Sequence, residues 1–461
     1  MDTRERTNRV LSLLAALVLS ATPAVLWAEA FPGAVGYGRG ATGWQGGAII
    51  PVTTLANAGR GSFRACAERD IPRICLIHVS GTVILSGPVM VRSNGYIAGQ
   101  TAPGDGLQLR LNGYGATPLV IKNAHDVLVR FLKIRPGPTI RPNPAVDAVT
   151  IENAQRVYLD HLSLSFATDE TFNVHASRGE TADITLARSL LSFSLDRSSH
   201  PKGRHSKGAL LCSYDATATG CGRITLWQNV FAHHRDRNPD VKASSTGPVE
   251  VVNNVFFNPI SQFGEYYNLV GPTHIIHVGN VTIPGPSTNS DRPPAVEIFP
   301  LGGAIPISIL PGDNIAYRGP CMTNSGAAVL GPVAQSKVVA APGLIPATPA
   351  EPAKGLVDRL LPIVGDSLHP DALDKRAVAD IVECRGRVIN APSQVGGWPD
   401  LRPRAAARDR DGDKFPDNWE AGQASLSVDR PDDPWSPHPS TGMPQITTWL
   451  SWLAGDISDP R

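Results

Sequence analysis

The chain has 461 residues, of which 42% are hydrophobic and 18% are charged, and its 42 Lys and Arg balance 41 Asp and Glu to a net charge of +1. This balance argues against a dedicated nucleic-acid-binding protein, because a polyanionic partner favours an excess of basic residues. The 44 Gly and 41 Pro residues indicate frequent turns, and the lack of a long run rich in Ala, Glu, Lys and Leu excludes an extended helical bundle.

The first 30 residues have the layout of a secretory signal peptide. Three arginines precede an apolar stretch at residues 10–18, and Ala28-Glu29-Ala30 offers small residues at the two cleavage positions. The apolar run is shorter than the ~20 residues that span a bilayer, and no later segment reaches that length. We therefore predict that residues 1–30 are removed and that the mature protein is secreted, to the periplasm or the extracellular medium, without a membrane anchor.

Six cysteines agree with export, because an even number in an oxidising compartment indicates disulfides. Two pairs are each nine positions apart, a separation that a hairpin-like loop can close, and the other two cysteines remain as a longer-range pair. The sequence contains no Cys-x-x-Cys, which makes a zinc site a weak interpretation. The predicted disulfides are Cys66–Cys75, Cys212–Cys221 and Cys321–Cys384.

A short unit of alternating, β-branched residues recurs between residues 31 and 285, with copies that begin at Val127, Val157, Ile184, Ile224, Val249 and Ile275. Strands that return every ~20–30 residues, with turn residues between them, are typical of a parallel β-helix, whose stacked turns share one core. The alternative is an irregular β-sandwich, although sandwich strands usually recur every ~8–12 residues. We predict an all-β chain with a right-handed parallel β-helix. Asn229, Asn254 and Asn280 hold equivalent places in three copies and are expected to form a hydrogen-bonded ladder.

The repeat pattern fades after Pro284. We predict a β-helix domain over residues 31–320. Residues 321–400 are expected to form an extension with one short helix, at about 371–382, packed on the β-helix. Residues 401–461 are expected to form a polar, mostly irregular tail.

This tail carries acidic residues at positions 1, 3, 5, 9 and 12 of a twelve-residue segment, which is the register of an EF-hand-like calcium loop. Gly412 stands at position 4, and Lys414 occupies position 6, where an EF-hand has glycine. The alternative is therefore an acidic surface turn. We predict a structural calcium site, because nothing in the segment resembles a catalytic group. Its ligands would be Asp409, Asp411, Asp413, Asp417 and Glu420.

Unusual polar residues concentrate in three segments of the repeat region, at 146–151, 167–173 and 233–242, and in an insertion at 198–220. Carboxylate and amide oxygens from the first two segments would make an open site for a hard cation such as calcium. Basic residues from the others would face it, an arrangement that suits an acidic polysaccharide. The predicted ligands are Asp147, Asp169, Glu170 and Asn173, and the predicted cations are Lys207, Arg235, Arg237 and Lys242.

Other polar residues in or near these segments are expected to have supporting roles. Asp160 and His161 are expected to be structural, with His161 hydrogen-bonded inside its turn. Four histidines fit no standard zinc spacing and are expected to line the groove. They are His200, His205, His233 and His234.

Several segments resemble the extracellular pectate lyases of the parallel β-helix class. They are Phe31-Pro-Gly-Ala-Val-Gly-Tyr-Gly-Arg39, Ile97-Ala-Gly-Gln-Thr-Ala-Pro-Gly-Asp105, Asp160-His-Leu-Ser-Leu-Ser-Phe166, Asp169-Glu170 and Arg237-Asn238-Pro239. The resemblance covers about residues 31–285. It implies a secreted, calcium-dependent enzyme that cleaves polygalacturonate-like chains and that we expect to be a monomer.

The resemblance also implies roles for single residues. Calcium would be held at Asp147, Asp169 and Asn173, substrate would be bound at Lys207 and Lys242, and Arg237 would be the base. At two of these positions the chain departs from the family pattern. Asn173 replaces a carboxylate, which predicts weaker calcium binding before substrate arrives, and Lys242 replaces an arginine and loses its bidentate fork.

The implied reaction is a β-elimination, in which Arg237 removes the C5 proton of a galacturonate unit and the C4–O bond breaks. A guanidinium is a poor base at neutral pH. Repulsion from Arg235, Lys242 and calcium would favour its neutral form, and we predict an alkaline activity optimum. One alternative is a β-helix glycoside hydrolase that uses Asp169 with Glu170 or Asp160. Another is a non-catalytic β-helix that binds acidic glycans.

Overall fold

The computed structural model describes residues 29–461 except 216, 243–245, 270, 290–295 and 341–343. The expected signal peptide therefore lies outside the described residues, apart from Glu29 and Ala30. Within the part of the chain that the structure describes, no helix is long and apolar enough to cross a membrane.

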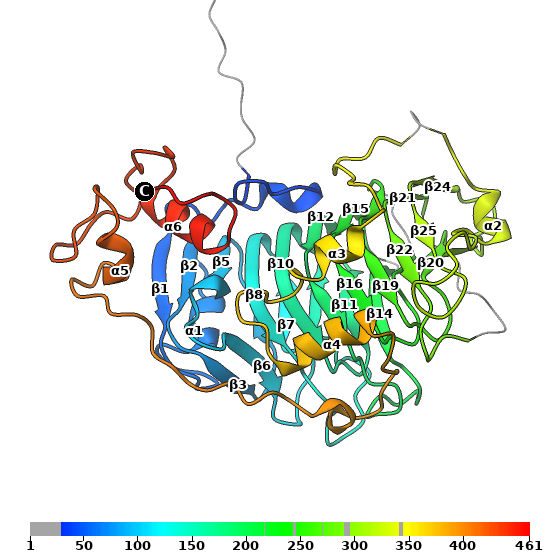
Figure 1. The fold of residues 1–461 in the computed structure, drawn as a ribbon, viewed down its shortest axis with the longest axis horizontal. Coiled ribbons are helices and arrows are strands. Elements are labelled where there is room, and N and C mark those ends of the chain that lie inside the picture. Colours follow the sequence, from blue (N-terminus) through cyan, green and yellow to red (C-terminus); the bar gives the residue numbers. More distant parts are fainter. Residues whose placement is uncertain (1–28, 216, 243–245, 270, 290–295, 341–343) are drawn as a thin grey trace, which may run out of the picture.

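Three rows of parallel strands form a parallel β-helix, as predicted, and each turn from β2 to β23 contributes to all three rows (Figure 1). The first row contains β1 (Ala48–Val52), β2 (Arg73–Ile77), β5 (Gly95–Ala98), β8 (His125–Ile134), β10 (Gln155–Ser165), β12 (Glu180–Ala187), β15 (Gly220–Trp227), β18 (Val249–Val252), β21 (Thr273–Val278) and β24 (Ile307–Gly312). The second contains β3 (Gly81–Leu85), β6 (Leu107–Leu111), β13 (Leu190–Ser192), β16 (Val230–Ala232), β19 (Val255–Phe257), β22 (Val281–Ile283) and β25 (Ile315–Ala316). β8 and β10 are long enough to continue from the first row into the second.

The third row is a separate sheet of eight strands, and it carries the residues with chemical potential. Its members are β4 (Val89–Met90), β7 (Leu119–Lys122), β9 (Val149–Glu152), β11 (Glu170–Ala176), β14 (Lys207–Tyr214), β17 (Asp240–Val241), β20 (Gly264–Tyr267) and β23 (Val296–Phe299).

The core is a column of apolar side chains inside the β-helix. Val127 pairs in register with Val157, which pairs with Ile184, Ile224 and Val249 in turn. All five side chains are buried. These are the first residues of the repeated unit, and stacking them removes a continuous apolar surface from water, which no single turn achieves alone.

The bend between the first two rows repeats with the same spacing. Phe131, His161, Arg188, Gln228 and Asn253 stand at equivalent places, and each adopts a left-handed φ between 43° and 55°. Because these turns change direction at an equivalent residue, their strands stay in register despite loops of different length. The longest turn has its additional residues mainly in the loop 193–206 between β13 and β14.

The predicted asparagine ladder is confirmed. Nδ2 of Asn229 donates to Oδ1 of Asn254 at 3.0 Å, and Nδ2 of Asn254 donates to Oδ1 of Asn280 at 3.1 Å. The ladder continues by one rung to Asn314, at 3.1 Å. Each amide also accepts from a neighbouring backbone N–H, so the buried polar groups of this bend are satisfied.

All three predicted disulfides are present. Their Cα–Cα distances are 5.9 Å for Cys66–Cys75, 5.6 Å for Cys212–Cys221 and 5.5 Å for Cys321–Cys384. The last one ties the end of the β-helix to the C-terminal extension.

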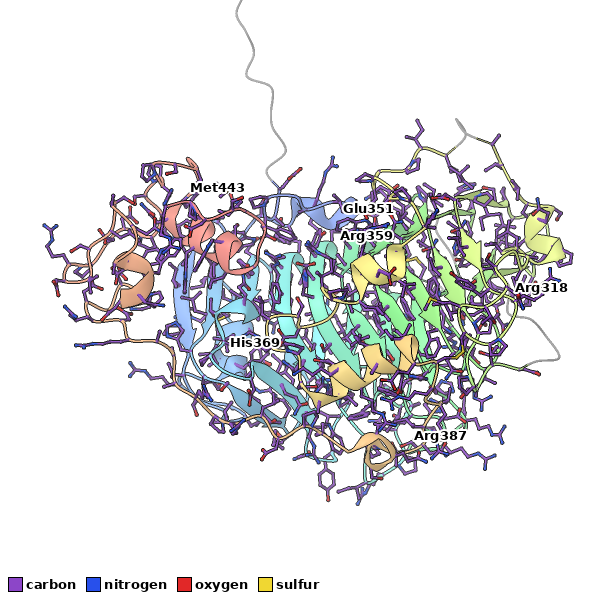
Figure 2. All side chains as sticks on the ribbon, in the orientation of Figure 1. Arg318, Glu351, Arg359, His369, Arg387 and Met443 are labelled. Atoms are coloured by element: carbon purple, nitrogen blue, oxygen red, sulfur yellow. A yellow bond between two sulfur atoms is a disulfide. The ribbon has the colours of Figure 1, made fainter. Side chains whose placement is uncertain are left out.

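The described residues of the extension contain three α-helices rather than the one expected, α2 (Pro332–Gln335), α3 (Leu356–Leu360) and α4 (Ala372–Val382), and a 3-10 helix, η3 (Pro392–Val395). α2 and α3 are too short to show a helical period in the sequence. α4 begins after Asp371, whose side chain accepts from the backbone N–H groups of Leu373 and Asp374. Arg359 of α3 forms an ion pair with Glu351, with its Nε 3.4 Å from Glu351 Oε2 (Figure 2).

The C-terminal tail is less polar in its packing than its composition predicts. It contains α5 (Asp417–Glu420) and α6 (Gln445–Leu453), which lie beside β1, β2 and β5 (Figure 1). Phe415, Trp419 and Trp449 are buried in one cluster with Leu76 and Tyr96 of the first row. The tail is therefore part of the folded body.

Candidate functional site

All eight residues predicted for the catalytic groove lie on or next to strands of the third row. Asp147 precedes β9, Asp169 and Glu170 stand at the start of β11, and Asn173 lies within it. The others stand at the start of β14 and on either side of β17, namely Lys207, Arg235, Arg237 and Lys242. Along β11 the side chains alternate, so that Phe172 and Val174 are buried in the core while Asn173 is partly exposed.

Asp147 is the centre of a buried acidic group. Its Oδ1 accepts from the backbone N–H of Glu170 at 3.1 Å, and its Oδ2 accepts from Thr150 Oγ1 at 2.5 Å and from Asn173 Nδ2 at 3.0 Å. Burial and the nearby Asp169 carboxylate raise the pKa of Asp147 well above its usual range. In this orientation Asn173 offers Asp147 its amide nitrogen rather than the oxygen expected of a ligand.

Asp169 is held by a pair of histidines. Its Oδ1 lies 2.6 Å from Nε2 of His205 and 3.9 Å from Nε2 of His200, and the two rings stack with centroids 3.7 Å apart. Burial, followed by His205, lowers the pKa of His200. These two histidines orient the predicted ligand, a role that the sequence analysis missed because the loop 193–206 brings them to Asp169.

Arg237 lies against the same acidic group. Its Nη1 forms an ion pair with Glu170 Oε1, its Nε lies 3.5 Å from Asp240 Oδ2, and its backbone N–H donates to Glu265 at 3.0 Å. Burial, with Glu265 nearby, raises the pKa of Asp240 to about 7. The residue predicted to be the base is thus next to the residues predicted to bind the cation, and it pairs with two acids.

The expected cationic wall is largely compensated by acids. Lys207 Nζ lies 2.6 Å from Asp236, and Arg235 forms a two-point contact with Asp196, at 2.5 and 2.7 Å. Asp196 was missed by the sequence analysis, because it precedes Arg235 by 39 positions and gave no local signal. Lys242 is partly exposed directly after β17, close enough to Asp240 to affect its charge.

Two of the four histidines do not line the groove. His233 and His234 are buried, with His233 hydrogen-bonded to Asn258 and His234 to Ser194. Both histidines follow β16 in a packed bend. Their burial lowers the pKa of each.

Asp160 and His161 are structural, as expected. Asp160 is fully buried between Arg130 and Arg188, at 2.7 and 2.9 Å, and His161 stacks on Phe131 with centroids 4.5 Å apart. Although burial alone would raise it, the two arginines and His161 hold the pKa of Asp160 far below its usual range. This carboxylate is not available to a substrate.

The acidic group fits a divalent cation. Asp147, Asp169 and Glu170 each offer a carboxylate oxygen, and these oxygens lie within 4.8 Å of one another. Three acids that crowd together repel each other unless a cation or protons compensate them. All-oxygen donors favour a hard ion such as calcium.

The tail loop forms a second acidic group with a different membership from the predicted one. Asp409, Asp411, Asp413 and Glu420 are brought together, and Asp432 joins them. Asp417 faces the other way: its Oδ1 accepts from the backbone N–H of Arg410 at 2.8 Å.

With its parallel β-helix, the chain has the fold and the relatives of a polysaccharide lyase. A family profile described as pectate lyase matches residues 88–280. The chain is 30% identical to "Probable pectate lyase C" of Aspergillus terreus over 85% of this chain and 86% of that protein, and 30% identical to the protein of the same name from Emericella nidulans over 89% of each. It therefore belongs to the pectate lyase family. Among solved structures, the major allergen from cedar pollen, jun a 1, has the same fold, with a TM-score of 0.51 and 19% identity over 72% of this chain and 92% of that one.

Proposed function

We propose that the protein cleaves polygalacturonate-like acidic polysaccharides by β-elimination, with Arg237 as the base and a calcium ion held by Asp147, Asp169 and Glu170. One observation carries the proposal: Arg237, on the segment before β17, pairs with Glu170, on β11, directly beside the acidic group. Such a pair would bring the base and the cation to the same uronate unit.

The chain's own residues perform most steps of the proposed reaction. Lys207 and Arg235 bind uronate carboxylates by exchanging Asp236 and Asp196 for the substrate, and Lys242 binds one from its partly exposed position after β17. Arg237 removes the proton from C5, a double bond forms between C4 and C5, and the C4–O bond breaks with its electron pair on the leaving oxygen. Calcium, when bound, would withdraw electron density from the C6 carboxylate and make the C5 proton more acidic.

The surroundings of Arg237 differ from those expected. Asp196 compensates the charge of Arg235, and Arg237 itself pairs with Glu170 and Asp240. We still expect an alkaline optimum, because a guanidinium is a poor base at neutral pH.

The test replaces Arg237 and follows unsaturated sugar ends by their ultraviolet absorbance, with polygalacturonate, in calcium and in chelator. Arg237→Ala is expected to lose at least ~100-fold in kcat, the scale of general base catalysis, and to keep the circular dichroism spectrum of the wild type. Arg223→Ala is the matched control, since Arg223 is a partly exposed arginine paired with Asp183 away from the site. Full activity of Arg237→Ala would overturn the proposal.

The same assay separates the alternatives. A hydrolase would produce reducing ends without ultraviolet absorbance, and a glycan-binding protein would produce neither. The hydrolase alternative is weakened because Asp160 is enclosed by Arg130 and Arg188. Export through residues 1–30, a monomeric state and the lack of a nucleic-acid partner stay predictions from the sequence.

A further inference from the structure

Five carboxylates gather where the loop after residue 408 meets α5. Asp409, Asp411 and Asp413 each offer an oxygen within 4.8 Å of the others, and Asp413, Glu420 and Asp432 do the same. Because Asp413 belongs to both groups, the five acids form one cluster. It lies in the loops and α5 of the C-terminal tail, whereas the proposed lyase site lies along the third row of strands.

Glu420 is the member of this cluster that contacts within the protein do not explain. Its side chain is 1% exposed, and neither of its carboxylate oxygens has a hydrogen-bond partner among the described residues. Burial of an ionised carboxylate without a partner is costly. Burial, with Asp413 and Asp411 nearby, raises the pKa of Glu420 to about 7.

The protein's own cations do not compensate the cluster. Lys414 Nζ donates to the carbonyl of Gly412, and Arg410 pairs with Asp429 at 2.5 Å. Asp417, the one predicted ligand outside the cluster, lies 3.6 Å from Arg408 Nε. No described side chain forms a hydrogen bond or ion pair with the buried oxygens of Glu420, and Arg410 acts on this carboxylate only from a longer distance.

We propose that Asp409, Asp411, Asp413, Glu420 and Asp432 bind a calcium ion that fastens the C-terminal tail to the β-helix. The donors are all oxygens, with no histidine or cysteine in either group, which favours calcium over zinc. Lys414, at the position where an EF-hand has glycine, adopts a φ of 90°, so the loop makes its turn there without glycine.

The cluster is placed to control how the tail is held. Phe415, inside the loop, packs edge-on against Trp449 of α6 with centroids 5.8 Å apart, and Trp419, next to Glu420, packs on Trp452 at 4.8 Å. α6 contacts the β-helix through Leu450, whose carbonyl accepts from Gln100 at 3.4 Å. A cation that joins the loop, α5 and Asp432 would fix this aromatic layer in place.

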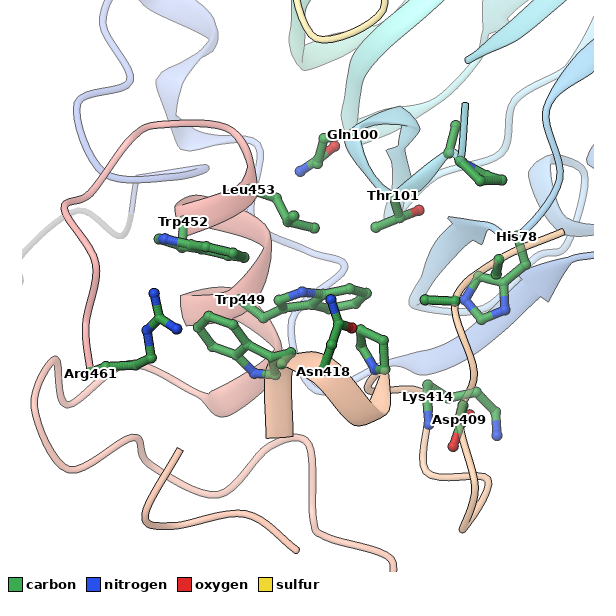
Figure 3. Close-up of a pocket in the computed structure, with 16 residues that line it drawn as sticks. His78, Gln100, Thr101, Asp409, Lys414, Asn418, Trp449, Trp452, Leu453 and Arg461 are labelled. Atoms are coloured by element: carbon green, nitrogen blue, oxygen red, sulfur yellow. Dashed lines mark hydrogen bonds between the residues drawn. The ribbon is translucent and has the colours of Figure 1, made fainter. Parts of the chain in front are cut away.

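The tail and the β-helix are incompletely packed where they meet, a region called the seam below. A cavity of about 280 Å³ lies there, with Trp449, Trp452 and Arg461 on the tail side and His78 and Gln100 on the β-helix side (Figure 3). Asp409 and Lys414 stand at one end of it. The seam is incompletely packed, so its closure depends on what anchors the loop.

The first experiment measures binding with terbium, which replaces calcium at oxygen sites and emits when nearby tryptophan is excited. The full mature protein is expected to show terbium emission that calcium displaces, because Trp419 adjoins the cluster. Glu420→Gln should lose most of this emission. The control Glu383→Gln, at a half-exposed glutamate paired with Arg385, should keep it. Equal emission from Glu420→Gln and wild type would overturn the proposal.

The second experiment separates a calcium ligand from a merely structural carboxylate. In chelator, Glu420→Gln is expected to have a Tm equal to or above that of the wild type, because an unpartnered buried charge has been removed. In calcium, the wild type is expected to gain several degrees more than Glu420→Gln, and Asp432→Asn should behave like Glu420→Gln. A Tm loss in Glu420→Gln that is the same with and without calcium would contradict calcium binding.

The result does not depend on the proposed lyase activity. Glu420→Gln is expected to cleave polygalacturonate like the wild type at saturating calcium and at a temperature below its Tm. Loss of the terbium signal with intact cleavage would support this site, whereas failure of cleavage in both proteins would count against the lyase proposal alone.

Discussion

The buried carboxylate of Glu170 forms an ion pair with the guanidinium of Arg237, 67 residues further along the chain. The backbone N–H of the same Glu170 donates to Asp147 at 3.1 Å. One residue therefore links the proposed base to the proposed cation site. A change in the charge of Glu170 is expected to affect both the position of Arg237 and the binding of the cation.

Glu170→Gln should weaken both. Arg237 loses its buried ion-pair partner and with it a fixed position, so kcat at saturating calcium is expected to fall by about 10–100-fold. The cation site loses one carboxylate, so the calcium concentration for half-maximal activity is expected to rise. Rates measured over a series of calcium concentrations give both values.

Glu152→Gln is the matched control for that experiment. Glu152 lies on the same row of strands and pairs with Lys122 at 2.8 Å, away from Arg237. Its kcat and calcium requirement should equal those of the wild type. If Glu170→Gln keeps the wild-type kcat at saturating calcium, Glu170 does not position Arg237.

His205 is expected to position Asp169 rather than to react with substrate. Its Nε2 lies 2.6 Å from Asp169 Oδ1, and outer partners of metal ligands typically contribute ~10–100-fold to affinity. His205→Ala should therefore raise the calcium concentration for half-maximal activity by about ten-fold while kcat at saturating calcium changes little.

The control for His205 is His274→Ala, because His274 bonds Ser308 at 2.8 Å on the first row, away from the site. A fall in kcat at saturating calcium in His205→Ala, with an unchanged calcium requirement, would mean that His205 acts on the substrate instead.

The repeated elements could be predicted from the sequence, and the contacts that depend on loops could not. Val127 and Val157 begin copies of a unit whose period predicts that they stack. The equivalent places of Asn229 and Asn254 in two copies predicted their ladder in the same way. Asp196 offered no such signal, because its contact with Arg235 is made by an irregular loop with no counterpart in other turns.

The same distinction holds for the two acidic groups. Asp169 and Glu170 are adjacent in the sequence and β11 begins at Glu170, so their closeness to one another could be predicted although the third row could not. Asp432 lies outside the twelve-residue register, and only the fold of the tail brings it to Glu420. Asp417 fits the register, but Arg408 and Arg410 attract it away from the cluster.

Asp160 should control stability at low pH. Its pKa is held far below the usual value by Arg188, His161 and Arg130 despite the opposing effect of burial. An acid with a lowered folded pKa contributes stability that is fully present above its unfolded pKa, near ~3.9, and is lost as pH falls below that value. Asp160→Asn leaves Arg130 and Arg188 without this partner and is expected to cost about 3–5 kcal/mol at pH 7.

Urea unfolding at pH 7, 4 and 3 would measure this effect, with the gap between wild type and Asp160→Asn expected to shrink as the pH falls. Asp183→Asn is the control, because the pair of Asp183 with Arg223 is partly exposed and should be worth at most ~1 kcal/mol. A gap that stays constant down to pH 3 would show that Asp160 stabilises the fold through packing rather than charge.

Asn254 occupies the middle of the ladder and should be its most sensitive rung. Its Nδ2 donates to the carbonyl of Leu226 and to Asn280, and its Oδ1 accepts from Asn229. Asn254→Ala leaves several buried groups unpaired and is expected to lower the free energy of unfolding by about 2–3 kcal/mol. Asn314, at the partly exposed end of the ladder, can recover partners from water, so Asn314→Ala should cost less than half as much. Equal losses at the two rungs, measured by urea unfolding, would mean that burial does not set the strength of the ladder.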